Sequence, residues 1–303
     1  MPAREYHATK ALGSTAIRIA ADMSVRHARI ATEKDATPAM RAGSLVHACT
    51  LEPGRIGTMF VVGKVQQCEG TTTKGAQCSR SSIAGAKHCR QHGGADEAEE
   101  WIASLGPDAE VVTSVELDNA RAVSEGVRAS VARSAFPRLL DGGDREVSYF
   151  ARAVPIDEHP GYKMVAEGDA GIAVKARVDI EHGGLCLDLK GVGDSRHLSP
   201  RRWGWRVLDY GLHVQAALYV DIIEAVTGTL PQWGWLPHES SPPYGTRIFD
   251  VDDGDLDGAR ELIALSLDRW AAYFETGDEW AGWPTDRTTV MVPYRTATEE
   301  EGD

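Results

Sequence analysis

The sequence lacks any run of about 18 apolar residues, the length that an α-helix needs to cross a bilayer. Its first residues, MPAREYHATKALG, also lack the basic-then-apolar pattern of a secretory signal. Both absences argue against a membrane or secreted protein, so we expect a cytoplasmic location and no membrane partner. Lysine is scarce too, with 8 Lys against 24 Arg, which makes a lysine beside a motif more informative.

Cysteine is limited to five residues, and an odd number in a chain of 303 residues argues against a disulfide framework. Reduced thiols or metal ligands fit better. We expect Cys49 and Cys186 to be buried thiols of the core, because free cysteine behaves as a small apolar residue. The other three lie close together between residues 64 and 95.

The formal net charge of -13 at first argues against DNA as a partner, because phosphate binding depends on Lys and Arg. Its distribution changes that reading. Residues 246–303 hold fifteen Asp and Glu against five Arg, a net of -10, so the first 245 residues carry only -3. The acidity is mostly a property of the C-terminal region, where we expect residues 296–303 to be a disordered acidic tail within a single domain spanning 1–303.

Apolar periodicity predicts helices that flank a run of strands. Helices are expected over residues 9–31, from Pro38 to Leu51, between 95 and 140, over 205–226, and over 255–276. Strands are expected at 145–155, 173–181, 185–192, 232–239 and 245–252. In the closing helix, Leu262, Leu265, Trp270 and Phe274 are the expected core residues. The pattern favours an α/β or α+β fold.

Residues 64–95 have almost no apolar side chains but contain a Cys-x9-Cys-x10-Cys-x2-His pattern, formed by Cys68, Cys78, Cys89 and His92. Three thiolates and one imidazole match a closed tetrahedral Zn²⁺ site, which stabilises a fold but leaves no position for catalysis. We therefore predict a zinc-binding module inserted in the domain. The alternatives are a disordered loop with exposed thiols, and His88 in place of His92.

Asp179 and the Asp188-x-Lys190 pair stand on two predicted strands joined by a Gly-Gly turn. Asp188 and Lys190 are two residues apart and so face the same side of one strand. Two converging carboxylates suit Mg²⁺ or Mn²⁺, and a lysine beside such an ion can position or deprotonate a water that attacks phosphorus. The alternative is a surface hairpin with an exposed Asp-Lys pair.

Further polar residues occur in a fixed order around this pair: His47 in a helical region, Glu146 on the preceding strand, and Gln215 with Tyr219 one turn apart on the following helix. This order resembles the PD-(D/E)xK nuclease superfamily and, more narrowly, the exonuclease VIII (RecE-type) recombination exonucleases of phages and prophages. The stretches that carry the resemblance are EYHA (5–8), MRAGSLVH (40–47), EVSYF (146–150), KARVD (175–179), LDLK (187–190) and YGLHVQAALY (210–219).

The resemblance implies an α/β fold with a central mixed sheet flanked by helices. It implies that Asp179, Asp188 and the Leu189 backbone carbonyl ligate a catalytic Mg²⁺, with His47 also at a metal. Lys190 would orient the attacking water, while Gln215 and Tyr219 would support the site or touch DNA. Glu146 matches a family acidic position of undefined role. Val178 replaces the motif's proline, and Asp188 fills its acidic position, so no ligand is lost.

The family also implies what this chain would do with DNA. Its members degrade linear double-stranded DNA from 5′ ends, leave 3′ single strands for an annealing protein in phage recombination, and assemble as rings. A related branch carries an iron-sulfur cluster on cysteines after the Q-x-x-x-Y helix, which is excluded here because no cysteine follows Cys186.

Four arginines with two interleaved tryptophans lie between the D-x-K strand and the Q-x-x-x-Y helix. We expect them to bind DNA through its backbone and bases, or else to be a solvated helix entry: Arg196, Arg201, Arg202 and Arg206. The alternative for the whole chain is a non-catalytic, zinc-dependent DNA-binding or assembly protein on a nuclease-like scaffold.

Overall fold

The computed structural model describes residues 3–34, 36–106, 109–281 and 283. Its helices are α1 (Ala3–Ala8), α2 (Ser14–Asp22), α3 (Val25–Glu33), α4 (Pro38–Leu51), α5 (Gly94–Ser104), α6 (Ser114–Ala132), α7 (Pro200–Asp209), α8 (Leu212–Thr227) and α9 (Asp253–Thr276). Its strands are β1 (Phe60–Val62), β2 (Glu110–Val112), β3 (Asp144–Pro155), β4 (Tyr162–Val165), β5 (Ile172–His182), β6 (Leu185–Val192), β7 (Gln232–Glu239) and β8 (Phe249–Asp250). The expected acidic tail, 296–303, lies outside the described residues.

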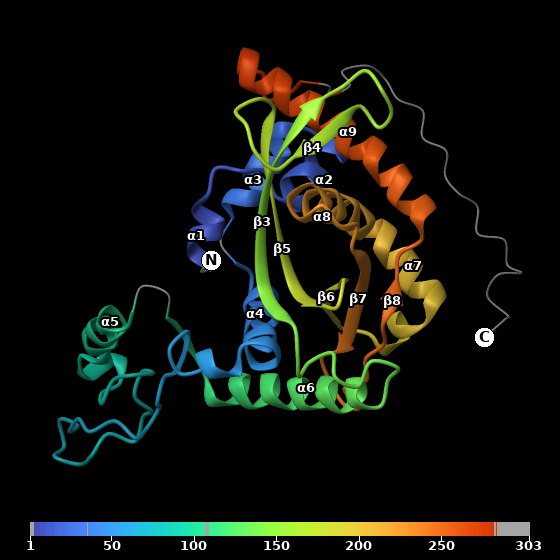
Figure 1. Ribbon diagram of the computed structural model, residues 1–303. Helices are drawn as coiled ribbons and strands as arrows, with labels where there is room; N and C mark the ends of the chain where they lie inside the picture. Colours follow the sequence, from blue (N-terminus) through green and yellow to red (C-terminus); the bar gives the residue numbers. More distant parts are fainter. Residues whose placement is uncertain (1–2, 35, 107–108, 282, 284–303) are drawn as a thin grey trace, which may run out of the picture.

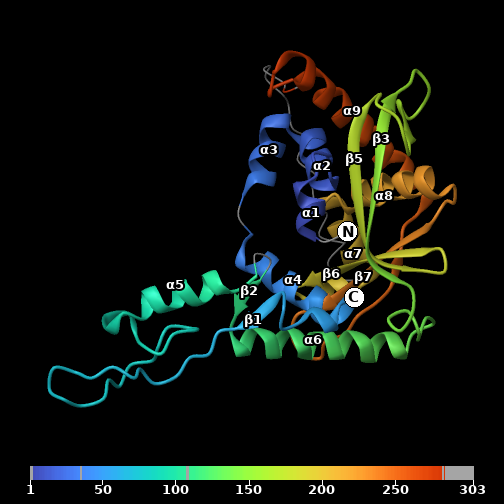
Figure 2. The same cartoon turned by 60° about the vertical axis from the view of Figure 1, so that its left-hand side comes forward.

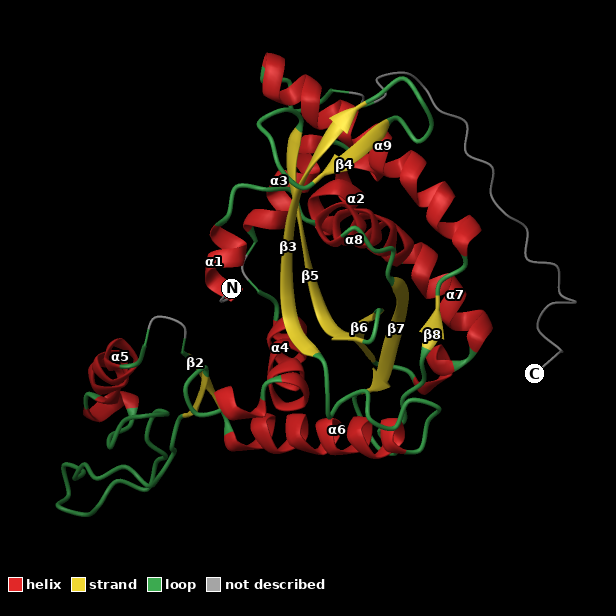
Figure 3. Cartoon of the chain, viewed as in Figure 1, coloured by secondary structure: helices red, strands yellow, loops and turns green. Residues whose placement is uncertain are grey.

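A six-stranded sheet in the order β4-β3-β5-β6-β7-β8 forms the centre of the fold (Figure 1). All neighbours are antiparallel except β6 and β7, which run parallel, so the sheet is mixed. Helices cover both faces (Figure 3). The expected α/β fold with a central mixed sheet is therefore confirmed.

Alternation along β6 explains why both faces are covered. Leu185, Leu187 and Leu189 belong to an apolar cluster with α4 and α6, whereas Cys186 belongs to a second cluster with α2, α7, α8 and α9. A strand that is buried on both faces carries apolar side chains on both, and polar side chains are the exception. The second face of β6 carries such exceptions in Asp188 and Lys190.

Two of the predicted helices are each divided in two. The expected helix 9–31 is wrong at its start and middle: Leu12 is extended and bridges Val174 of β5, and the chain breaks at Met23–Ser24 between α2 and α3. The expected helix 205–226 breaks before Leu212, because Gly211 has φ +60, a conformation that favours glycine. Apolar spacing runs through both breaks, which is why periodicity alone misses them.

Two smaller expectations also differ. The helical stretch 95–140 contains α5 and α6 separated by the short strand β2, because residues 110–112 pair with β1. On α9, Leu265 is 42% and Phe274 is 58% exposed, so neither belongs to the core, whereas Trp270 is buried. Within the described residues, no helix is both long and apolar enough to traverse a bilayer.

The insertion stands apart from the sheet. It leaves the body after β1 and returns through β2, which pair in parallel, and both views place α5 and the preceding loops outside the helices that cover the sheet (Figures 1 and 2). Arg41 of α4 anchors its base through an ion pair with Glu110 and a hydrogen bond to the Val111 carbonyl. We call residues 63–105 the arm.

The sheet divides between β5 and β6, and this division creates the site. The two strands pair only from Ile180 opposite Leu187 to the turn at Gly183–Gly184. Farther along, β6 continues beside β7, while β5 continues beside β3 with Leu12 bridging its other edge at Val174. The β5 edge from residue 176 to 179 is thereby left between α1 and α8.

His238 on β7 gives the folded protein a dependence on pH. The side chain is 3% exposed and its Nδ1–H donates to the Glu239 carbonyl at 3.3 Å. Burial lowers the pKa of His238 to about 4, against 6.5 as the usual value. Between about pH 6.5 and 4, the unfolded chain therefore binds a proton at this residue that the folded chain does not.

Acidification through this window is expected to lower the free energy of unfolding, by about 1.4 kcal/mol per pH unit from this one group. The His238→Asn variant keeps a donor near Nδ1 but cannot titrate, so its pH dependence should be flatter. Urea unfolding of both proteins at pH 7.5, 6 and 5 measures the difference. Parallel pH profiles for the two proteins would contradict this account.

Candidate active site

Asp179 occupies the point where β5 and β6 separate. Its Oδ2 accepts a hydrogen bond from the Leu189 backbone N–H at 2.7 Å, which replaces the ladder bond that the divergence removes. The local twist is strong, since Val178 packs in the cluster with α8 and Ile180 packs in the cluster with α4 and α6. The carboxylate is therefore buried at the division of the sheet, with only 7% of the residue exposed.

Asp188 lies on the adjacent strand and points toward α8. Its Oδ1 accepts a hydrogen bond from Gln215 Nε2 at 2.9 Å, and its Oδ2 lies 2.6 Å from Lys190 Nζ. Asp188 and Lys190 share one face because they are two residues apart on a strand. Gln215 reaches them from the first turn of α8, which the left-handed Gly211 starts at that point.

His47 approaches from the other side on α4. Its Nε2–H donates to the Leu189 carbonyl at 2.9 Å, and its Nδ1 lies 3.7 Å from Asp179 Oδ2 and 3.8 Å from Glu146 Oε1. The Thr37 side chain caps the start of α4 and Pro38 stands in its first turn, so the helix has a defined start ahead of His47.

Glu146 holds an unusual backbone conformation opposite Asp179. Its φ is +53, which a residue with a side chain adopts rarely and at a cost of roughly 1–3 kcal/mol. Its Oε2 accepts a hydrogen bond from Arg177 Nε at 2.5 Å, and its Oε1 faces His47. The strained position thus turns a carboxylate toward the imidazole.

The pKa values follow from burial of several charges at close range. Burial lowers the pKa of His47, but Asp179 and Glu146 outweigh this and raise it to about 9. Burial raises the pKa of Asp179 to about 7 although His47 opposes that change. For Lys190, burial lowers the pKa, and Asp188 and Asp179 more than reverse this, so the ammonium stays charged. Two protonated cations thus offset the carboxylates.

Tyr219 is buried one turn after Gln215 and lies close enough to Tyr6 of α1 to add to the rise that burial causes in the pKa of the Tyr6 phenol. Tyr6 also lies under Lys175 and Arg177, whose charged groups are 4.7 Å and 5.6 Å from its ring. Lys175 Nζ donates to the carbonyls of Tyr6 at 2.7 Å and Thr9 at 3.1 Å. These contacts fix α1 against the open edge of β5.

The structure therefore brings together all seven residues expected in the active site, from α4, β3, β5, β6 and α8. The sequence interpretation gave no role to three neighbours, Tyr6, Lys175 and Arg177, although EYHA and KARVD were among the stretches that carried the resemblance. Their partners lie far away along the chain, so the sequence carried no signal for their roles beyond those stretches.

Three side chains, one imidazole and two carboxylates, converge closely enough to hold one metal ion: His47, Glu146 and Asp179 each offer an atom within 4.8 Å of the others. This group differs from the expected ligand set, because it contains Glu146 and omits Asp188. Both Asp188 oxygens are directed to Gln215 and Lys190 instead.

The four arginines expected to bind DNA are arranged differently from one another. Arg196 is paired with the neighbouring Asp194, and Arg206 stacks on Tyr210 with its guanidinium carbon 4.4 Å from the ring centre. Arg201 and Arg202 are exposed on α7. Of the two interleaved tryptophans, Trp203 is buried and Trp205 is 62% exposed.

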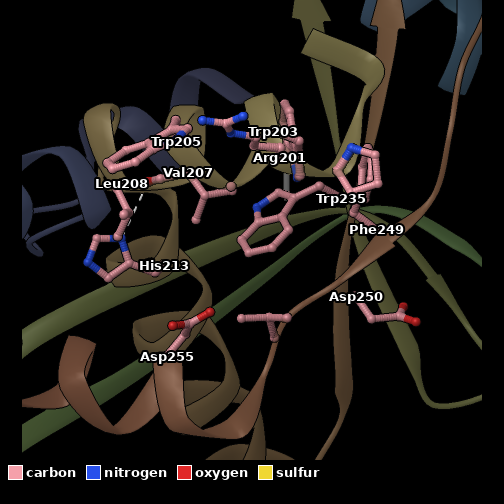
Figure 4. Close-up of a pocket in the computed structure, with 13 residues that line it drawn as sticks. Arg201, Trp203, Trp205, Val207, Leu208, His213, Trp235, Phe249, Asp250 and Asp255 are labelled. Carbon is pink, nitrogen blue, oxygen red and sulfur yellow. Dashed lines mark hydrogen bonds between the residues drawn. The ribbon is translucent and has the colours of Figure 1, made fainter. Parts of the chain in front are cut away.

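A groove of about 400 Å³ runs along α7 and includes Arg201, Trp205, His213 and Trp235 in its lining (Figure 4). Trp235 of β7 is the strand neighbour of Asp188, so the groove lies one strand away from the cluster. The groove offers aromatic faces and a cation on that side of the sheet.

A second group of side chains that can bind a metal lies in the arm. Cys78 Sγ and Cys89 Sγ are 4.0 Å apart, while His92 Nδ1 is 3.3 Å from Cys68 Sγ and 3.6 Å from Cys89 Sγ. The cysteines form an apolar cluster of their own. Gly70 allows the close approach, since a Cβ there would lie 2.4 Å from His92 Nδ1. His88 instead pairs with Glu97.

No protein-family model matches the chain, and no curated protein matches it. Among solved structures, the chain resembles that of a protein from Eubacterium rectale described as a "putative exonuclease". The TM-score is 0.53 with 13% sequence identity, and the match covers 90% of this chain and 85% of that one. At this identity the likeness shows a shared fold.

Proposed function

We propose that the chain is a metal-dependent deoxyribonuclease whose active site is the division between β5 and β6. The observation that carries the proposal is the arrangement around Leu189: Asp179 and His47 hydrogen-bond its backbone N–H and carbonyl. The ion pair of the buried Asp188 with Lys190 flanks the same residue on β6. A surface hairpin, the alternative for this motif, does not bury two carboxylates. The fold shared with the Eubacterium rectale protein supports the same class of activity.

The donor set fits Mg²⁺ or Mn²⁺. Carboxylate oxygens from Asp179 and Glu146, with the His47 imidazole, stand close enough to share one ion, and Asp188 with the Leu189 carbonyl lies beside them. A bound divalent cation would stabilise negative charge on the phosphate oxygens and acidify a water. The protonated His47 already supplies positive charge beside these carboxylates. Because an imidazole nitrogen must lose its proton to bind a metal ion, ion binding is expected to release protons.

The chain's own residues supply position and hydrogen bonds. Lys190 Nζ lies 2.6 Å from Asp188 Oδ2, and its proposed role is to donate a hydrogen bond to the attacking water and orient it. Gln215 holds Asp188 in its orientation through the bond to Oδ1. Tyr219 of α8 lies near Lys190, with Tyr6 of α1 beside it. Arg177 holds the Glu146 carboxylate toward His47.

We further propose the narrower assignment of an exonuclease VIII (RecE-type) enzyme. In this role it would digest linear double-stranded DNA from 5′ ends and leave 3′ single strands for a single-strand annealing protein in phage recombination, working as a homo-oligomeric ring. The order of motifs from EYHA to Q-x-x-x-Y supports this. Arg201, Arg202 and Trp205, exposed on α7, are the proposed DNA contacts.

The arm is proposed to hold a structural Zn²⁺. Tetrahedral zinc with bonds of about 2.3 Å to sulfur and 2.0–2.1 Å to nitrogen separates its ligands by about 3.8 Å between sulfurs and about 3.6 Å between sulfur and nitrogen. The observed separations of 3.3, 3.6 and 4.0 Å fit this geometry. Burial raises the pKa of the Cys68 thiol, but hydrogen bonds led by the Cys89 N–H lower it below its usual value, which favours the thiolate that zinc binds.

The first prediction concerns the phosphodiesterase chemistry. Asp188→Asn and Lys190→Ala are each expected to lower the Mg²⁺-dependent digestion of linear duplex by on the order of 10²–10³-fold, because each removes a charged group at the reacting phosphate. The rate of release of labelled nucleotides measures it. Lys163→Ala, at an exposed lysine of β4, is the matched control and should digest normally.

Thermal unfolding must show that both site variants remain folded. Normal digestion by the two folded variants would contradict the proposed site. DNA binding by the wild type with no Mg²⁺-dependent loss of substrate would instead favour a binding or assembly protein on this scaffold.

The second prediction separates an exonuclease from an endonuclease. An enzyme that needs a free end should digest linear duplex and leave covalently closed circular duplex of the same sequence intact. One gel that compares the two substrates with Mg²⁺ decides, and nicking of the circle would rule out the exonuclease assignment.

The third prediction concerns the zinc. The purified chain should contain about one zinc per molecule, and Cys89→Ser should lose it, because three ligands hold the ion far less tightly. Hydrogen exchange should then accelerate in residues 64–92 while β5 and β6 stay protected, since those strands lie in the separate apolar core. Ser79→Ala, at an exposed neighbour of Cys78, serves as the control. Equal exchange in the zinc-free and zinc-bound arm would contradict a structural role.

A further inference from the structure

The loops of the arm carry an excess of positive charge, which the Glu97 carboxylate of α5, bound to the Lys87 and His88 backbone N–H groups, offsets only in part. Residues 64–92 hold five cations, Lys64, Lys74, Arg80, Lys87 and Arg90, and a single acidic residue, Glu69. All five cations are exposed, and none of them makes an ion pair with a described residue. With three thiolates on one zinc ion, the loops keep a net charge of about +3.

Apart from Glu69 and Glu97, the acidic residues of the arm lie on a different face from the loops. Helix α5 turns Ala98 and Trp101 toward the loops, where a Cβ at Gly85 would overlap the Trp101 ring, and Glu97 faces His88. At about 100° per residue, Asp96, Glu99 and Glu100 fall on the opposite side of the helix, and all three are exposed. The arm is therefore positive on its metal loops and negative on its outer helix face.

The loops also lack the groups that bind single strands. Residues 64–95 contain no Phe, Tyr or Trp, so they offer no ring on which an unpaired base could stack. Cations without aromatic neighbours suit contacts to the phosphate backbone, which position nucleic acid independently of its sequence.

The base of the arm is joined to α4, the helix that carries His47. The joint consists of the parallel β1–β2 pair and the contacts from Arg41. Both views show the arm projecting from this end of α4 and α6, beyond the body (Figures 1 and 2). Its loops are thus free to meet a long ligand that also reaches the site.

We propose that the metal loops of the arm bind the phosphate backbone of duplex DNA outside the active site, through Lys74, Arg80, Lys87 and Arg90. The arm grips the duplex while α4 and the divided sheet act on its end. This deepens the proposed nuclease function and rests on it for the identity of the ligand. Zinc acts only by holding the loops in shape.

The test measures binding without cleavage. The full-length Lys190→Ala chain, loaded with zinc and without Mg²⁺ or chelator, is titrated into a fluorescent 30-base-pair duplex at several salt concentrations. Adding Lys74→Gln, Arg80→Gln, Lys87→Gln and Arg90→Gln together is expected to weaken binding at least about 10-fold near 0.15 M salt. Every cation that no longer neutralises a phosphate should also reduce the slope of log K against log salt by about 0.9.

Two matched controls keep the outcome specific. Arg133→Gln with Arg138→Gln removes exposed cations after the far end of α6, and Glu99→Gln with Glu100→Gln changes charge on the outer face of α5. Both should bind with a slope close to that of the parent. Zinc content reports that the arm remains folded. If the fourfold variant loses zinc, Lys74→Gln with Arg80→Gln, which leaves the residues beside Cys89 intact, replaces it.

The proposal would be overturned if the zinc-loaded loop variant bound DNA with unchanged affinity and salt slope. It would also be overturned if the α6 control lost as much affinity as the loop variant. Failure of the nuclease proposal looks different, because it is read from Mg²⁺-dependent digestion by the wild-type chain. The binding titration does not depend on that activity.

Discussion

The divergence of β5 from β6 at Asp179 is the constraint on which the rest of the site depends. Once the strands part, the Leu189 N–H loses its ladder partner, and a buried N–H without an acceptor is costly. The Asp179 carboxylate takes that place. Burying this charge in turn requires positive partners, and His47 and Lys190 stand around it from α4 and β6. The polar cluster is thus a consequence of how the sheet divides.

Part of this arrangement could be predicted from sequence because it depends on local periodicity. The period of two along a strand places Asp188 and Lys190 on one face, and the Gly-Gly turn predicts the hairpin that brings Asp179 near. The mixed sheet with helices on both faces also agrees with the fold expected from the sequence. The roles of the site residues remain predictions, since their placement alone does not test the chemistry.

Other parts could not be predicted, because they depend on contacts between distant segments. The hydrogen bonds from Lys175 to the carbonyls of Tyr6 and Thr9 join residues more than 160 positions apart, and no spacing rule predicts them. The left-handed backbone at Glu146 is invisible in a strand-like pattern. The breaks before α3 and α8 have a local cause instead. Apolar residues continue at helical spacing on both sides of each break, so the sequence pattern predicts one continuous helix.

The attachment of the arm has a geometric consequence. Its base is clamped to α4 by Arg41, and the same helix presents His47 to Leu189 less than two turns farther on. Because α4 is buried in one apolar cluster with α6 and the sheet, the base of the arm and the imidazole keep a fixed spacing along one helix. Anything held at the base of the arm therefore lies at a constant offset from the Leu189 carbonyl.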